Sequence, residues 1–85
     1  MSLGFNDALL SLALLKGYVA ANTDTPGTTN YYGFTRTDGA YYILKEAIAG
    51  NVATYTYYKS DSGVYATDWT NRASLTYGRY DTIFK

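Results

Sequence analysis

The chain contains no cysteine, no histidine and one proline in 85 residues. Without cysteine it forms no disulfide and no thiolate zinc site, and without histidine it lacks the usual imidazole for metal binding and acid–base chemistry. Domains of this size have little net stability and usually gain more from disulfides, metals or oligomerisation. We therefore expect no cofactor and no metal, and the composition favours oligomerisation.

Charge of either sign is also scarce. Seven basic residues balance seven acidic ones, and charged residues make up 16% of the chain, below the roughly 25% of an average domain. The basic residues are scattered and do not form the patch that nucleic-acid binders show, so we expect no nucleic-acid partner. A neutral, aromatic-rich chain is poorly soluble as a monomer, which again favours a buried interface.

Long apolar runs are missing as well. The one strongly aliphatic segment, Ala8–Leu15, is much shorter than the ~20 apolar residues that span a bilayer. No basic region precedes Phe5, as a signal peptide would require. The sequence therefore predicts neither a transmembrane segment nor a signal peptide.

The same aliphatic segment predicts an N-terminal helix. Asn6 or Asp7 is a suitable N-cap, and Gly17 is a suitable residue just past the C-terminus. The apolar arc is wider than a surface helix needs, which indicates a core or interface helix. The alternative is a strand-like arm that pairs with a neighbouring subunit. The residues expected to anchor this segment to another subunit are Leu9, Leu12 and Leu15.

Tyrosine, in contrast, is abundant. Most of the eleven tyrosines fall in three runs, Tyr31-Tyr32, Tyr41-Tyr42 and Tyr55–Tyr58. Successive side chains of a strand point to opposite faces, so a doubled Tyr places one ring on each face. These runs predict a small sheet with aromatic surface on both sides. One short chain has too little material to cover both faces, which indicates a partner, most simply a second copy.

Turn residues divide the tyrosine-rich region into a meander. Asp38-Gly39 favours a two-residue type I′ hairpin, and Gly50-Asn51 is a second signal of the same kind. Every residue of Asn22–Asn30 is a turn or loop former, which predicts an exposed loop. The predicted strands are Tyr31–Arg36, Ala40–Ile48 and Val52–Lys59. The predicted fold is mainly β (α+β): an N-terminal helix or arm and loop over residues 1–30, then a three-stranded antiparallel meander with a short helical end over residues 31–85.

The turns also fix the expected register. With two-residue loops, Phe34 and Tyr58 flank Ile43 on one face of the sheet. The opposite face is expected to serve assembly, because Tyr gives large contact area at small entropic cost. Alternatively, helices cover one face and solvent tolerates the tyrosines of the other. The residues expected at the oligomer interface of the sheet are Tyr31, Tyr42, Leu44, Tyr55 and Tyr57.

The C-terminal part predicts a short helix that packs onto the sheet. Thr67 or Asp68 can cap a helix over Trp69–Ala73. Arg72 is expected to pair with Asp68, and the alternative is that it anchors an interface. A fourth strand at Ser74–Tyr77 is the alternative. A single Trp in a small domain is usually a core anchor. The predicted core residues are Phe34, Ile43, Tyr58, Trp69, Leu75 and Phe84.

Catalytic chemistry is not indicated. Asp38 and Asp61 are explained as turn residues, and Glu46, the one glutamate, lies mid-strand among tyrosines without an evident partner. Serines have no histidine to activate them, and no Gly-rich phosphate loop is present. We expect that the protein is not an enzyme.

The order of motifs after residue 30 resembles a group of small proteins encoded among the structural genes of tailed bacteriophages. The resemblance rests on the patterns YYGFxxxDGAYYILKE (Tyr31–Glu46), YTYYK (Tyr55–Lys59) and YATDWTNRASLTY (Tyr65–Tyr77), with Asp81 and Phe84 at the end. It implies a homo-oligomeric virion component of head, neck or tail that contacts other virion proteins. The resemblance does not extend to residues 1–30, and it implies no catalytic or ligand-binding residues.

Two functions from different classes follow. The leading hypothesis is a self-assembling structural subunit of a phage particle, made in the host cytoplasm and located in the virion. The alternative is a small surface binding module, a glycan or receptor adhesin, that uses Trp69 and exposed tyrosines. Asp68 and Asn71 lie beside Trp69 and could bind sugar hydroxyls.

Overall fold

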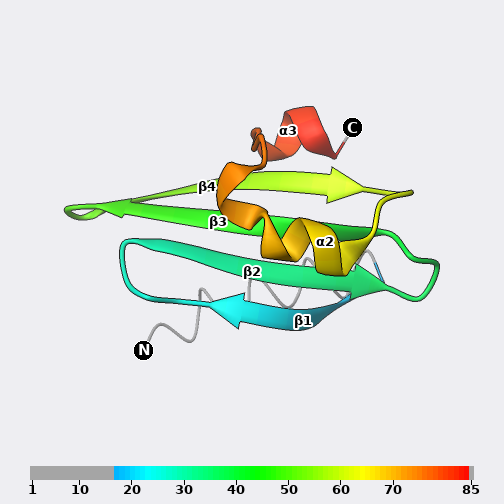
Figure 1. Ribbon diagram of the computed structural model, residues 1–85. Helices are drawn as coiled ribbons and strands as arrows, with labels where there is room; N and C mark the ends of the chain where they lie inside the picture. Colours follow the sequence, from blue (N-terminus) through cyan, green and yellow to red (C-terminus); the bar gives the residue numbers. More distant parts are fainter. Residues whose placement is uncertain (1–16, 85) are drawn as a thin grey trace.

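The computed structural model describes residues 17–84, which form one antiparallel sheet with three short helices (Figure 1). The predictions on Leu9, Leu12 and Leu15 lie outside the described residues. The strands follow one another in space in the order β1-β2-β3-β4. Their bounds are Tyr18–Asp24 (β1), Thr29–Arg36 (β2), Tyr41–Ala49 (β3) and Val52–Ser60 (β4). The mainly-β class is thus confirmed, but the sheet has four strands and not three.

The additional strand, β1, lies in the region where we expected a helix end and a loop. Its second half, Asn22–Asp24, is polar, and strand propensity alone disfavours it. The segment is nevertheless extended because it pairs with β2 from Tyr18 opposite Arg36 to Asp24 opposite Tyr31. Polar residues are tolerated here because β1 is at the edge of the sheet that residues 17–84 form. The register shifts between Ala20 and Asn22, which marks a β-bulge.

The first hairpin differs from the prediction by one residue. Arg36 and Ala40 close a three-residue turn: Ala40 O accepts from Arg36 N at 2.8 Å, and Arg36 O accepts from Gly39 N at 3.0 Å. Gly39 has φ +92°, the left-handed residue of a three-residue loop with a bulge. The expected two-residue loop was wrong because Asp38 Oδ1 accepts from Ala40 N at 3.1 Å, which stabilises the wider turn.

This single residue changes the faces of the sheet. Gly33, not Phe34, lies opposite Ile43, and Phe34 lies opposite Tyr42. A shift of one residue moves every β2 side chain to the other face. The second hairpin has the predicted two-residue loop: Ala49 lies opposite Val52, and Ile43 lies opposite Tyr58 as expected.

Helices lie against both faces. α2 (Tyr65–Thr70) and the 3-10 helix η1 (Arg72–Ser74) are on one side, here called the α2 face, where Tyr41 packs edge-on against Tyr65. The chain then passes the edge of β4, and α3 (Tyr80–Ile83) leads to Phe84, which packs on Tyr42 at the opposite side, here called the α3 face. The predicted helix over Trp69–Ala73 therefore starts earlier, and no side chain caps α2.

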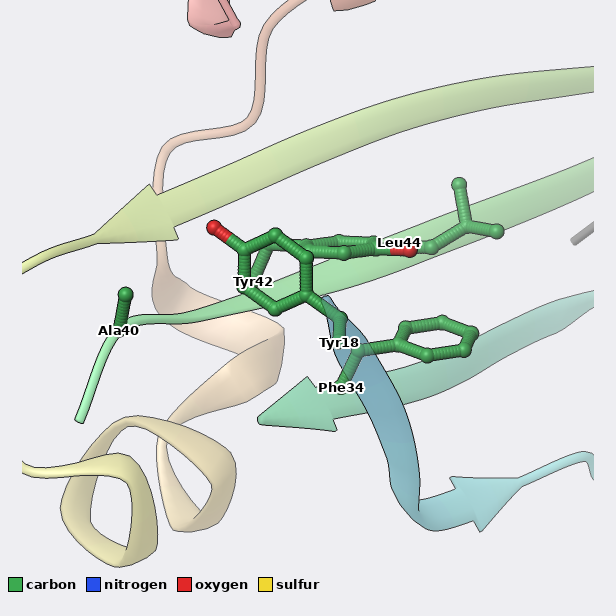
Figure 2. Packing of buried hydrophobic residues seen from close by; sticks show 5 residues of the cluster. All are labelled: Tyr18, Phe34, Ala40, Tyr42 and Leu44. Atoms are coloured by element: carbon green, nitrogen blue, oxygen red, sulfur yellow. The ribbon is translucent and has the colours of Figure 1, made fainter. Parts of the chain in front are cut away.

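The buried residues divide between the two faces. On the α3 face, the strands β1, β2 and β3 and the residue before β3 contribute a cluster shown in Figure 2, made of Tyr18, Phe34, Ala40, Tyr42 and Leu44. Ile43 and Tyr41, also fully buried, point to the α2 face. The alternative fourth strand at Ser74–Tyr77 is wrong, because beside β4 this region contributes an isolated bridge between Gly78 and Tyr57.

Candidate assembly and binding surfaces

The predicted interface residues of the sheet are mostly inside the chain. Tyr31, Tyr42 and Leu44 are 8%, 1% and 0% exposed. They were expected at a surface because the sheet was thought to lack cover, but the chain itself encloses them. Tyr55 and Tyr57 are half-buried and pack against the α3-face cluster. In this conformation the tyrosine-rich centre of the sheet therefore offers little area to a second subunit.

The predicted core residues fall into two groups. Phe34 and Ile43 are buried, but on opposite faces of the sheet. The other four are half-buried: Tyr58, Trp69, Leu75 and Phe84. Of these, Phe84 packs edge-on in the α3-face cluster, with its ring centroid 5.1 Å from that of Tyr42 and 5.6 Å from that of Tyr57. The sequence could not place the side chains of β2, because the register of β2 against β3 differs by one residue from the expected one.

A buried carboxylate, Glu46, organises one end of the α3 face. Glu46 is 7% exposed, and its Oε1 accepts hydrogen bonds from Asn30 Nδ2 at 2.8 Å and from the Tyr32 hydroxyl at 3.0 Å. Its Oε2 accepts from the Tyr55 hydroxyl at 3.2 Å. A buried charge is tolerated when it is fully hydrogen-bonded. The expectation that Glu46 has no partner was wrong, because the corrected register brings Asn30 opposite it.

A second carboxylate, Asp68, ties α2 to the sheet. Its Oδ2 accepts hydrogen bonds from the hydroxyls of Tyr41 and Tyr58, the latter at 3.1 Å. Asp68 is therefore not the partner of Arg72. The two residues do not lie on one continuous helix, because α2 ends at Thr70 and Arg72 begins η1.

Arg72 instead joins the helical segment to β1. Its Nη2 lies 2.7 Å from Asp24 Oδ2, and its Nη1 donates to the Trp69 carbonyl at 2.7 Å. The guanidinium also lies over two rings, 4.5 Å from the Trp69 centroid and 5.7 Å from the Tyr31 centroid. Arg72 thus combines an ion pair with cation–π contacts and fixes the position of the indole.

Trp69, the candidate sugar platform, is already in contact with other side chains. Besides Arg72, Tyr65 stacks on it at a centroid distance of 6.1 Å. Tyr65 in turn crosses β2 where Gly33 has no side chain, and its hydroxyl donates to Asn22 Oδ1 at 2.9 Å. A Cβ on Gly33 would overlap the Tyr65 hydroxyl, so the glycine permits this close approach.

Burial and carboxylate neighbours raise the pKa of several tyrosines above that of a free phenol. Desolvation, followed by the hydrogen bond to Glu46, raises the pKa of Tyr32 to about 12. Desolvation, followed by the hydrogen bond to Asp68, raises the pKa of Tyr41 to about 12. Burial also raises the pKa of Tyr65 to about 12. These phenols are hydrogen-bond donors at neutral pH and not nucleophiles.

The raised pKa values predict alkaline unfolding. The unfolded chain loses these protons near the ordinary phenol pKa of 10.0, whereas the folded chain holds them up to about 12. The contribution of these phenols to stability should therefore be constant below pH 10 and fall as the pH rises from 10 to 12. Tyrosinate absorbance should rise late in the native protein and near pH 10 in denaturant. Native phenols that all titrate near pH 10 would contradict this description.

Exposed apolar side chains lie at the margins of the sheet. The end of the β3–β4 hairpin, residues 47–54, carries Ile48 and Val52, which are 36% and 64% exposed. The first residue of β2, Thr29, lies opposite Ala47. The tip of the β3–β4 hairpin therefore extends past the beginning of β2 (Figure 1). No charged residue occurs between Ala47 and Tyr58. At the opposite edge of the sheet, Val19 of β1 is 57% exposed.

The described residues can be assigned to a structural class from their sheet and helices. Within residues 17–84, no group of three or more acidic residues is placed to hold a metal ion, and no helix is long and apolar enough to cross a membrane. The class is that of a small four-stranded antiparallel sheet with short helices on both faces. No protein family, curated protein or solved structure gives a match to the chain.

Proposed function

We propose that the protein is a structural, self-assembling subunit of a bacteriophage particle, with no catalytic role. The assembly part is supported by an exposed apolar margin at the end of the β3–β4 hairpin, formed by Ile48 and Val52. Apolar residues that are exposed together at the rim of a domain often mark contacts with another protein. The motif pattern of residues 31–77 supports the assignment to a virion, where partners would be further copies and other virion proteins.

The test is the mass of the purified chain in solution. Size-exclusion chromatography with light scattering should give a discrete oligomer of the 9.4 kDa chain, because burial of the apolar margin is favourable. A monomer at every accessible concentration would contradict self-assembly. The virion assignment is tested separately, by whether the purified chain binds purified head, neck or tail proteins encoded beside its gene.

The alternative, a glycan-binding module centred on Trp69, has less support. Sugar stacking needs a free indole face, and Arg72 and Tyr65 both contact this indole. The fluorescence of Trp69 separates the two functions, since it is the one tryptophan of the chain. Insensitivity to added mono- and oligosaccharides is expected for the structural subunit. A saturable change on adding sugar would favour the binding module.

A further inference from the structure

We propose that the free edge of β1 pairs with β1 of a second copy, antiparallel and about a two-fold axis, so that two sheets become one. This proposal rests on the proposed self-assembly and specifies the contact that produces it. The strand order places β1 at the edge, with β2 as its one neighbour among the described strands. Unpaired N–H and C=O groups at such an edge accept a further strand.

β1 has a β-bulge, which is one of the features that protect edge strands from association, but over most of its length it lacks the charged and proline residues that most edges carry. Edges are usually guarded by Lys, Pro or inward-pointing charges. From Tyr18 to Thr23 the strand has no charged residue and no proline. Its side chains from Val19 to Thr23 are exposed irrespective of the face to which they point. Among residues 17–84, no helix and no charged side chain between Tyr18 and Thr23 would have to be displaced for a second strand to approach this edge.

The opposite edge of the sheet is covered at its middle. Tyr57 of β4 and Gly78 exchange two backbone hydrogen bonds, of 2.8 and 2.9 Å. α3 follows directly, and Tyr80 packs on Tyr57 with a centroid distance of 5.5 Å. A neighbouring strand could pair only with the first half of β4 before meeting this segment.

This difference between the edges determines the symmetry. A head-to-tail array joins two different edges and needs both of them free, whereas a two-fold pair uses the same edge twice. With β1 uncovered by the described residues and β4 covered at its middle, the pair closes after two copies. Such a dimer is the expected building block, and Ile48 and Val52 at the hairpin end remain exposed in it for contacts with other proteins.

Charge placement selects the antiparallel direction. Asp24 is the one charged residue of β1 and lies at its C-terminal end. In an antiparallel pair the two Asp24 side chains lie at opposite ends of the contact. In a parallel pair the two Asp24–Arg72 ion pairs would be neighbours, which brings like charges close together. The bulge at Ala21 limits the length of the ladder, so we expect a dimer that dissociates on dilution.

Charge substitution on β1 tests the edge. Val19→Lys should raise the dimer dissociation constant by about tenfold or more, because a lysine on an edge strand has to lose its hydration when a further strand pairs there. Val19→Thr keeps a β-branched, uncharged residue and should leave the dimer intact. Val52→Lys adds the same charge at the hairpin end and should also leave it intact. Sedimentation equilibrium measures the constants, and circular dichroism verifies that each variant is folded.

The outcomes separate this proposal from the proposed function. A wild-type oligomer that resists Val19→Lys but dissociates with Val52→Lys would overturn β1 pairing and leave self-assembly standing. A wild-type monomer would overturn both. The location is checked with Ala21→Cys, which introduces the sole cysteine of the chain near the two-fold axis. Mild oxidation should cross-link this variant within the dimer, and Val52→Cys should remain uncross-linked; the reverse pattern would overturn the proposal.

Discussion

Replacing Glu46 with leucine is expected to remove most of the stability of the fold. The substitution leaves Asn30 Nδ2 and the hydroxyls of Tyr32 and Tyr55 without their shared acceptor. Each buried donor that loses its partner costs ~1–3 kcal/mol. The two hydroxyls are half-buried and recover part of this through water, so we expect a loss of about 2–4 kcal/mol. Domains of this size have only ~3–5 kcal/mol of net stability.

Two further variants show whether the hydrogen bonds cause the loss. Glu46→Gln keeps the oxygen that accepts from Asn30 and Tyr32, and its amide can donate to the Tyr55 oxygen, so it should cost about 1 kcal/mol. Asp81→Asn removes a carboxylate from the exposed Arg79–Asp81 pair and should change stability by less than about 0.5 kcal/mol. Urea unfolding followed by circular dichroism gives the three values. Equal stability of Glu46→Leu and the wild type would contradict the network.

How far the sequence predicts this fold depends on how local each signal is. The Gly50-Asn51 loop is specified by two residues, and the β3–β4 register follows from it as expected. The length of the loop at Asp38-Gly39 depends on a further residue, because the Ala40 N–H donates to the Asp38 side chain. Turn-residue preferences do not distinguish two- from three-residue loops at such a sequence. Because of that one-residue difference, every β2 side chain lies on the opposite face of the sheet from the predicted one.

The β1 strand could not be predicted because its signal is not local. Residues Asn22–Asp24 read as loop formers, and only pairing with β2, through partners such as Tyr32 opposite Thr23, makes them extended. The Arg72–Asp24 ion pair then follows from that pairing and spans 48 positions of sequence. A spacing rule such as i, i+4 finds Asp68 first and misses it.

The Glu46 network left a weak signal in the sequence that could have been used. A lone glutamate in the middle of an apolar strand is costly to bury unless donors surround it. Polar donors on the neighbouring strands were therefore to be expected, and Tyr55 lies opposite Glu46 in the register that was predicted correctly. Asn30 could not be found, because it was assigned to a loop and belongs to β2.

The second large effect is expected in the aromatic cluster on the α3 face. Two variants of Tyr42 measure separately what its ring and its hydroxyl contribute to stability. The ring stacks on Phe34 at 4.7 Å and meets Tyr18 edge-on at 4.8 Å. Tyr42→Ala removes these contacts and leaves a cavity, for which ~3–5 kcal/mol is typical of large aromatic residues. We expect this variant to be largely unfolded at 25 °C by circular dichroism.

Tyr42→Phe, in contrast to Tyr42→Ala, should not lower the stability of the protein. The hydroxyls of Tyr42 and Tyr18 are buried and have no hydrogen-bond partner among residues 17–84. An unsatisfied buried hydroxyl is unfavourable, so its removal should leave stability unchanged or raise it by about 1 kcal/mol. Tyr32→Phe is the matched control, because its hydroxyl donates to Glu46 at 3.0 Å, and it should lose about 1 kcal/mol. If Tyr42→Phe instead destabilised the protein as much as Tyr32→Phe, the Tyr42 hydroxyl would have a partner in solution and the cluster would be polar at its centre. The measured difference between the two Phe variants therefore decides whether this core is held together by ring packing alone.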